Sequence, residues 1–178
     1  MEKRMGNIIV QKPGGTAGKH ATAYKLSLPT LWVKEMGLLE NRQVQMCFDG
    51  EMITIKKKMD MKSFTQKAKE KNHEILLFTY YDGEKLCSRI AADYTEKSIC
   101  VENYVADALK RAFGNMSDPG WEDFLSFLET RCIPKERAGL REYLDAIGAE
   151  SYDPLEIIRI TGGRMAEDQQ WLKVEVPT

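Results

Sequence analysis

The chain has 178 residues, of which 43% are hydrophobic and 30% charged, so its length suits one medium domain or a small domain plus a larger one. Its longest apolar run is far shorter than a membrane-spanning helix, and its first residues lead into a predicted strand instead of a signal-peptide core. These features argue against a membrane or secreted protein and predict a cytoplasmic one.

The formal net charge is −1, but the charge is unevenly distributed. Residues 1–58 contain ten Lys and Arg against five Asp and Glu, whereas residues 59–178 contain sixteen against twenty-two. A basic N-terminal part joined to an acidic remainder is compatible with DNA binding by the N-terminal part. In the remainder, we interpret the charge as solvated surface.

The four cysteines are spread along the chain without a close pair: Cys47, Cys87, Cys100 and Cys132. Each occurs in an otherwise apolar pattern, which is typical of small buried residues. Only His20 and His73 could assist a zinc site, so we predict structural thiols and neither a metal nor another cofactor. An even count would also permit two disulfides, but nothing else indicates secretion.

A glycine-rich segment follows the first predicted strand, Ile8–Val10. It spans residues 14–19 and ends in Gly-Lys, which invites comparison with a phosphate-binding P-loop. The comparison fails because Pro13 stands where the first glycine is required, His20 replaces the Ser or Thr, and a strand follows instead of a helix. We therefore predict a bending loop that brings basic residues together: Lys12, Lys19 and Lys25, with His20 beside them.

The stretch YKLSLPTLWVKEMG, residues 24–37, changes from strand to helix at a proline. Tyr24 and Leu26 alternate with Lys25, which predicts a strand with one apolar face. After Pro29 the spacing becomes helical and stops at Gly37.

Two more strands complete this unit. A polar corner that ends at Arg42 precedes the alternating strand 44–48, Asp49-Gly50 predicts a hairpin turn, and the return strand ends in three lysines at 56–58. A unit of about fifty residues with such short strands buries too little surface alone, so we expect it to pair with a second copy.

This order of elements resembles the AbrB/MazE/SpoVT family of swapped-hairpin DNA-binding domains over about residues 7–57, on the segments LSLPTLWVKEMGL and VQMCFDGEMITIKK. The resemblance implies a barrel-like homodimer of interlocked chains whose basic residues contact double-stranded DNA. The loop 14–23 is longer than usual and lysine often replaces arginine, so backbone contacts and shape readout should dominate. The candidate DNA-binding residues are Lys12, Lys19, His20, Lys25, Lys34 and Arg42.

Two domains are predicted, residues 1–58 and an α+β domain at 74–178, and a basic linker at 59–73 joins them. The linker is read either as a solvated helix or as a flexible basic strap that contacts DNA phosphates. The last domain is predicted as a three-stranded meander followed by about four helices and a closing strand at 170–176. The expected helices are 105–113, 119–132, 136–147 and 155–160.

The stretch 152–171 places Arg159, Arg164, Glu167 and Asp168 near a double glycine. One reading is a binding face or a carboxylate pair with an arginine clamp; the other is a capped helix, a glycine stop and an ion pair that docks the tail. Because the stretch holds neither histidine nor a metal-ligand cluster, we predict no catalytic residues and no enzyme.

The leading functional interpretation is a dimeric transcriptional regulator, a repressor or autoregulator from a bacterial mobile element. The alternative is an antitoxin or an inhibitor of the anti-CRISPR type. In that case the C-terminal domain would bind a toxin or nuclease while the N-terminal domain autoregulates. A neighbouring toxin gene, or phage and plasmid neighbours, would favour the alternative.

Overall fold

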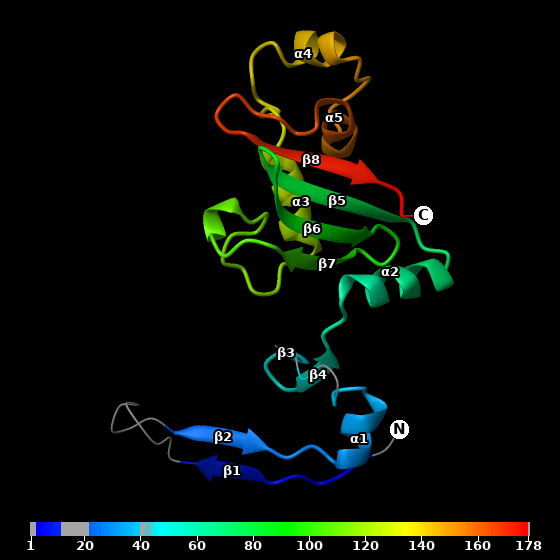
Figure 1. Ribbon diagram of the computed structural model, residues 1–178, viewed down its shortest axis with the longest axis vertical. Coiled ribbons are helices and arrows are strands. Elements are labelled where there is room, and N and C mark those ends of the chain that lie inside the picture. The colour runs from blue at the N-terminus through cyan, green and yellow to red at the C-terminus, as the bar shows by residue number, and fades with distance from the viewer. Residues whose placement is uncertain (1–2, 12–21, 40–41, 43, 178) are drawn as a thin grey trace. The chain divides into compact units, whose positions relative to one another are not determined.

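The computed structural model describes residues 3–11, 22–39, 42 and 44–177 (Figure 1). The chain divides into two compact units, Met1–Lys58 and Met59–Thr178. The first unit ends at the residue where the sequence analysis places the end of the N-terminal domain. The described residues mix α-helices with antiparallel sheets, which confirms the predicted α+β class.

The first unit contains two antiparallel strand pairs and one short helix. Its elements are β1 (Ile8–Gln11), β2 (Ala23–Leu26), α1 (Thr30–Glu35), β3 (Val44–Phe48) and β4 (Ile53–Lys57). Their order is the predicted one. β1 pairs with β2 and β3 pairs with β4, and the carboxylate of Asp49 accepts hydrogen bonds from two backbone N–H groups in the predicted turn between β3 and β4.

The predicted switch from strand to helix occurs at Pro29. This residue has φ −57°, which suits the start of a helix, and its carbonyl accepts a hydrogen bond from the N–H of Val33 at 3.1 Å. Gly37 adopts φ +63°, a left-handed conformation that glycine tolerates, and so ends the helix.

The strands of the first unit form two separate two-stranded sheets within the described residues. A single chain thus shows no closed barrel there. The interlocked barrel remains a prediction about two chains.

The second unit is built on a four-stranded antiparallel sheet with the order β7-β6-β5-β8 (Figure 1). Its strands are β5 (Ile75–Asp82), β6 (Lys85–Asp93), β7 (Ser98–Asn103) and β8 (Gln170–Glu175). The predicted meander and closing strand are confirmed. The pairing of β8 with β5 was not predicted, because it joins residues about ninety positions apart.

The segment predicted as a linker is part of the second unit. It forms helix α2 (Met61–Glu70), which begins where the side chain of Asp60 accepts a hydrogen bond from the N–H of Ser63. Phe64 and Ala68 are buried in a small core formed with the sheet. The segment is helical, as one of the two readings expected, but Phe64 and Ala68 anchor it to the sheet, so it is not a freely solvated linker.

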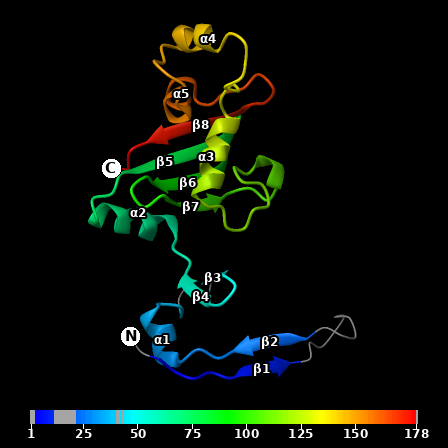
Figure 2. The same cartoon turned by 180° about the vertical axis from the view of Figure 1, so that it is seen from behind.

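Helix α3 (Trp121–Thr130) covers the opposite face of the sheet from α2 (Figure 2). The ring of Phe124 meets Phe78 edge to face with centroids 5.1 Å apart, and Phe127 meets Tyr80 in the same way at 5.3 Å. These contacts form the main core.

The remaining helices are shorter than predicted at some ends. The expected helix at 105–113 is only a 3₁₀ turn, η1 (Ala108–Lys110), because Arg111 side-chain hydrogen bonds to the carbonyls of Val105 and Ala106 hold this segment as a loop. Helix α4 (Leu140–Ile147) starts four residues later than predicted, and α5 (Pro154–Thr161) lies where it was expected.

The stretch 152–171 contains the ion pair of the second interpretation, but Asp168 pairs with Arg131, which lies outside the stretch. Arg131, only 6% exposed, forms a bidentate pair with Asp168, with N–O distances of 2.7 and 3.0 Å. It also donates to the carbonyls of Gly163 and Gln170. Arg164 instead lies over the ring of Trp171. The pair therefore fixes the tail to the end of α3.

None of the four cysteines forms a disulfide in the described structure. Cys87 and Cys132 are buried and Cys100 is half-buried. Cys47 is exposed, so the expectation of burial is wrong for it within one chain, because nothing in the described part of that chain covers this face of β3.

The end of α2 is fastened to the sheet by His73. Its Nδ1 lies 2.7 Å from a carboxylate oxygen of Asp93, whose other oxygen accepts hydrogen bonds from the N–H groups of Thr95 and Glu96. Burial raises the pKa of Asp93, but the hydrogen bonds from Glu96 and His73 outweigh it, so the pKa lies below its ordinary value of 3.8.

Replacing Asp93 by Asn is expected to lower the free energy of unfolding by about 1–2 kcal/mol at neutral pH, because these hydrogen bonds lose a charged acceptor. With its lowered pKa, the carboxylate stabilises the fold above pH 3.8, and that contribution disappears as the pH falls through the folded-state pKa. Urea unfolding at several pH values measures both effects, with the exposed Asp145→Asn as control. Equal acid sensitivity of Asp93→Asn and the wild type would contradict this role.

Candidate nucleic-acid interface

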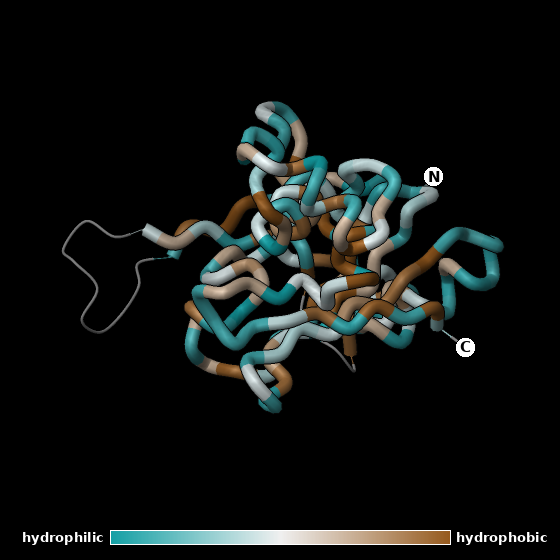
Figure 3. Tube along the Cα trace, turned by 90° about the horizontal axis from the view of Figure 1, so that it is seen from above, coloured by the Kyte–Doolittle hydropathy of each residue, from teal (hydrophilic) through white to brown (hydrophobic). Residues whose placement is uncertain are grey.

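The pairing of β1 with β2 sorts their side chains onto two faces. Ile8 lies opposite Leu26, and Val10 opposite Tyr24, so these four apolar residues share one face. Lys25 lies opposite Ile9 on the other face. We call the first set the apolar face of β1–β2; hydrophobic stretches of this part of the chain are brown in Figure 3.

The apolar face of β1–β2 is open to solvent, with its four residues 55–70% exposed. The pair β3–β4 has a similar face, on which Met46, Phe48 and Ile53 are 65–69% exposed. In the described part of the first unit, Leu38 is the one buried side chain, at 6% exposure. Apolar faces of this kind are expected to be covered by another protein surface.

Three of the six predicted DNA-binding residues are described, and all three are exposed. Lys25 projects from the polar face of β2, and Lys34 occupies the last turn of α1, where a positive charge interacts favourably with the helix dipole. Arg42 precedes β3. The other three, Lys12, Lys19 and His20, lie outside the described residues.

The structure adds a basic residue that the sequence analysis did not select. Lys56 lies opposite Gln45, on the polar face of β4, whereas Lys57 lies opposite Val44 on the face that also holds Met46. The alternation of the strand would have distinguished these two lysines, but the sequence alone shows them as one run.

A second basic group was also missed. The guanidinium of Arg4 lies 5.9 Å from the ring centroid of Trp32 on α1, within the range of a cation–π interaction. No sequence pattern indicates this contact, since it joins residues that precede and follow both strands of the first pair.

The arrangement places positive charge and apolar surface on opposite sides of a strand pair. An ammonium group on an exposed strand face can contact a phosphate oxygen, while the opposite face remains available for association. In the described segments, no group of three or more His, Cys, Asp or Glu side chains is placed to hold a metal ion.

No protein-family model, no curated protein and no solved structure matches this chain. Among the helices of the described residues, none combines the length and apolar character needed to traverse a bilayer.

Proposed function

We propose that the protein is a dimeric DNA-binding transcriptional regulator, a repressor or autoregulator, whose first unit both dimerises and contacts DNA. The observation that carries this proposal is the division of β1–β2 into an exposed apolar face and an opposite face that bears Lys25. The positive charge of residues 1–58 supports it.

A second copy of the first unit is the proposed cover for the apolar faces. Full burial of an aliphatic or aromatic side chain is worth about 1.5–3 kcal/mol, so the four residues of the apolar face of β1–β2 could contribute roughly 6 kcal/mol or more per chain. Strands of two chains would then interlock into the barrel that the sequence resemblance implies. Such a dimer would present each basic face twice, which suits a site with two-fold symmetry.

DNA binding in this proposal relies on phosphate contacts. Lysine is a compact point charge and lacks the planar fork with which arginine reads guanine, so Lys25 and Lys34 are suited to the backbone. Specificity would then come mainly from DNA shape and from whether both halves of the dimer engage.

Replacing Lys25 by Ala is expected to weaken DNA binding and its dependence on salt. Each phosphate contact contributes about −0.9 to the slope of log K against log salt, so losing two symmetry-related contacts should reduce the slope by about 2. Fluorescence anisotropy titrations of the full chain over a salt series measure the slope.

The matched control is Lys85→Ala, an exposed lysine on β6 of the second unit, which should leave both affinity and slope unchanged. An unchanged slope for Lys25→Ala would remove this residue from the contact list. An equal loss in both variants would show that charge anywhere on the chain suffices, and would contradict a specific interface on β1–β2.

A second candidate function is partner binding by the second unit in an antitoxin or nuclease inhibitor. Two observations favour it: this unit has a core of its own, and residues 59–178 carry an excess of six negative charges. An acidic domain would complement a basic nucleic-acid-binding target. Pull-down by the full chain of proteins encoded beside its gene, with and without competitor DNA, tests this function.

A further inference from the structure

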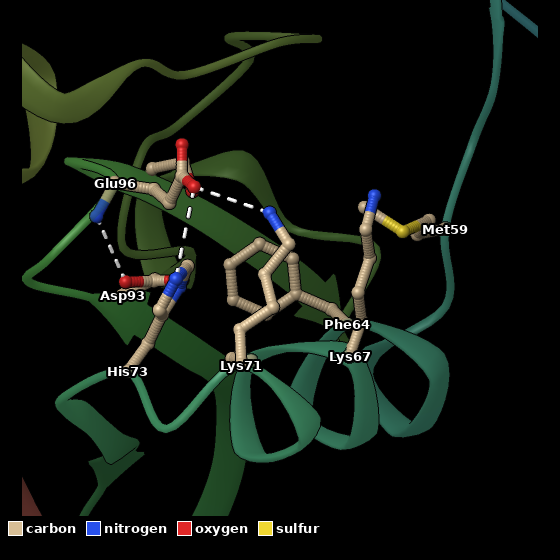
Figure 4. Close-up of a pocket in the computed structure, with 9 residues that line it drawn as sticks. Met59, Phe64, Lys67, Lys71, His73, Asp93 and Glu96 are labelled. Carbon is tan, nitrogen blue, oxygen red and sulfur yellow. Dashed lines mark hydrogen bonds and ion pairs between the residues drawn. The ribbon is translucent and has the colours of Figure 1, made fainter.

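A small cleft opens between α2 and the turn that joins β6 to β7 (Figure 4). Its volume is about 120 Å³, which suits a small ion better than an extended ligand. Apolar walls come from Met59, Phe64 and Ala68, and three nitrogen-bearing side chains reach it: Lys67, Lys71 and His73.

His73 presents one ring nitrogen to this cleft. The side chain is only 12% exposed, and its Nδ1 is engaged by Asp93 at 2.7 Å. Both oxygens of Asp93 are occupied, so this carboxylate fixes the ring without filling the cleft. The Nε2 atom has no hydrogen-bond partner among the described residues; its nearest ionic neighbour is Glu96, at 3.7 Å.

A carboxylate of the chain itself lies close to two of these nitrogen-bearing side chains. One oxygen of Glu96 lies 3.2 Å from the Nζ of Lys71 and 3.7 Å from the Nε2 of His73. Figure 4 shows this carboxylate above the two side chains. Because the side chain of Glu96 is half exposed and flexible, an external oxyanion can replace its carboxylate with little loss of stability.

The charges around the cleft fit an anion with two negative charges. With Glu96 in place, two lysines face two carboxylates. If Glu96 turns out to solvent and a dianion enters, the two positive charges of Lys67 and Lys71 face the two negative charges of the dianion. Lys67 has no ion-pair partner in the described structure, and it stands one helical turn before Lys71.

We propose that this cleft binds a phosphate monoester, which replaces the carboxylate of Glu96. The ammonium groups of Lys67 and Lys71 donate to the phosphate oxygens, beside the Nε2 edge of the His73 ring. This site lies within the second unit and does not depend on the DNA-binding function proposed above.

The neighbouring Ser98 raises the question of a Ser-His-Asp catalytic triad, since all three residue types line the cleft. A triad needs the serine hydroxyl hydrogen-bonded to Nε2. In the described structure no hydrogen bond joins Ser98 to His73, and the ion near Nε2 is Glu96. The geometry therefore favours binding over nucleophilic catalysis.

Titration of the full chain with inorganic phosphate tests the proposal. Histidine ring signals in ¹H–¹⁵N spectra report the site directly, and His73→Gln assigns them, because His20 is the one other histidine of the chain. Lys71→Ala should weaken phosphate binding about tenfold, since it removes a charged hydrogen-bond donor. Glu96→Gln should tighten binding by about threefold, because it removes the competing carboxylate.

Two further titrations decide the ligand class. A 5′-phosphorylated oligonucleotide should shift the His73 signals, whereas the same oligonucleotide without the terminal phosphate should not. Equal shifts with both oligonucleotides would overturn the monoester assignment in favour of a phosphodiester. Unchanged His73 signals, or equal affinities of the wild type, Lys71→Ala and Glu96→Gln, would overturn the site.

Discussion

Replacing Leu26 by Asp is expected to convert the proposed dimer to a monomer and to abolish the proposed DNA binding. Leu26 lies on the exposed apolar face of β1–β2, directly opposite Ile8. The substitution removes from each subunit one aliphatic side chain that the proposed interface would bury, and places a charge there, so dimerisation should weaken by about 3 kcal/mol or more. Sedimentation equilibrium measures the change.

The neighbouring residue provides a matched control. Lys25→Asp introduces the same side chain one position away on the opposite face of the strand. It should leave the proposed dimer intact but abolish the proposed DNA binding, so the two variants separate assembly from recognition. If both variants remain dimeric, the apolar face of β1–β2 is not the dimer interface. Tertiary signals from the second unit, whose core is separate, show whether a monomeric variant has kept that unit folded.

Replacing Arg131 by Met is expected to destabilise the second unit by about 3 kcal/mol, near the low end of the cost of breaking a buried ion pair, because Asp168 keeps some contact with water. The substitution removes the bidentate pair and the hydrogen bonds to the carbonyls of Gly163 and Gln170. Urea unfolding followed by tryptophan fluorescence measures the loss.

The free energy of unfolding of Arg131→Met should also fall less at acidic pH than that of the wild type. The hydrogen bond from Arg131 holds the pKa of Asp168 below its ordinary value, against the effect of burial. This pair therefore stabilises the fold above the ordinary pKa and loses its effect as the pH falls through the lower folded-state pKa. The difference in free energy of unfolding between the wild type and Arg131→Met should therefore become smaller at acidic pH.

Two further variants distinguish the buried pair from surface charge. Lys135→Met breaks the half-exposed pair with Glu129 and should cost less than about 1 kcal/mol. The double variant Arg131→Met/Asp168→Met should recover part of the loss, because no carboxylate is then left without its partner. A loss for Arg131→Met as small as that for Lys135→Met would mean that the tail is held by β8 pairing alone.

Some features could be predicted from the sequence because they depend on neighbouring residues. The switch at Pro29, the end of α1 at Gly37, the turn at Asp49-Gly50 and the start of α5 at Pro154 all follow from local backbone preferences. The opposite orientations of Lys25 and Leu26 likewise follow from strand alternation, so the two faces of β2 could be predicted from the sequence.

Other predictions were wrong because contacts between distant parts of the chain, or side-chain contacts to the backbone, decided the local structure. The lysine-rich composition of 59–73 suggested a linker, yet two apolar residues four positions apart were enough to dock α2 on the sheet. The pattern at 105–113 suggested a helix, but the side chain of Arg111 satisfies the backbone carbonyls in a loop. In both cases tertiary contacts outweighed the local signal.

The sequence by itself determined the α+β class, the order of the strands along the chain and the basic character of the first unit, because these depend on composition and on spacing within a few residues. Only the tertiary structure decided that β8 pairs with β5, that Asp168 is held by Arg131, and that His73 and Glu96 meet beside Lys71. Each of these contacts joins residues at least twenty positions apart. Their pairing is set by how the sheet and helices pack, which no local pattern encodes.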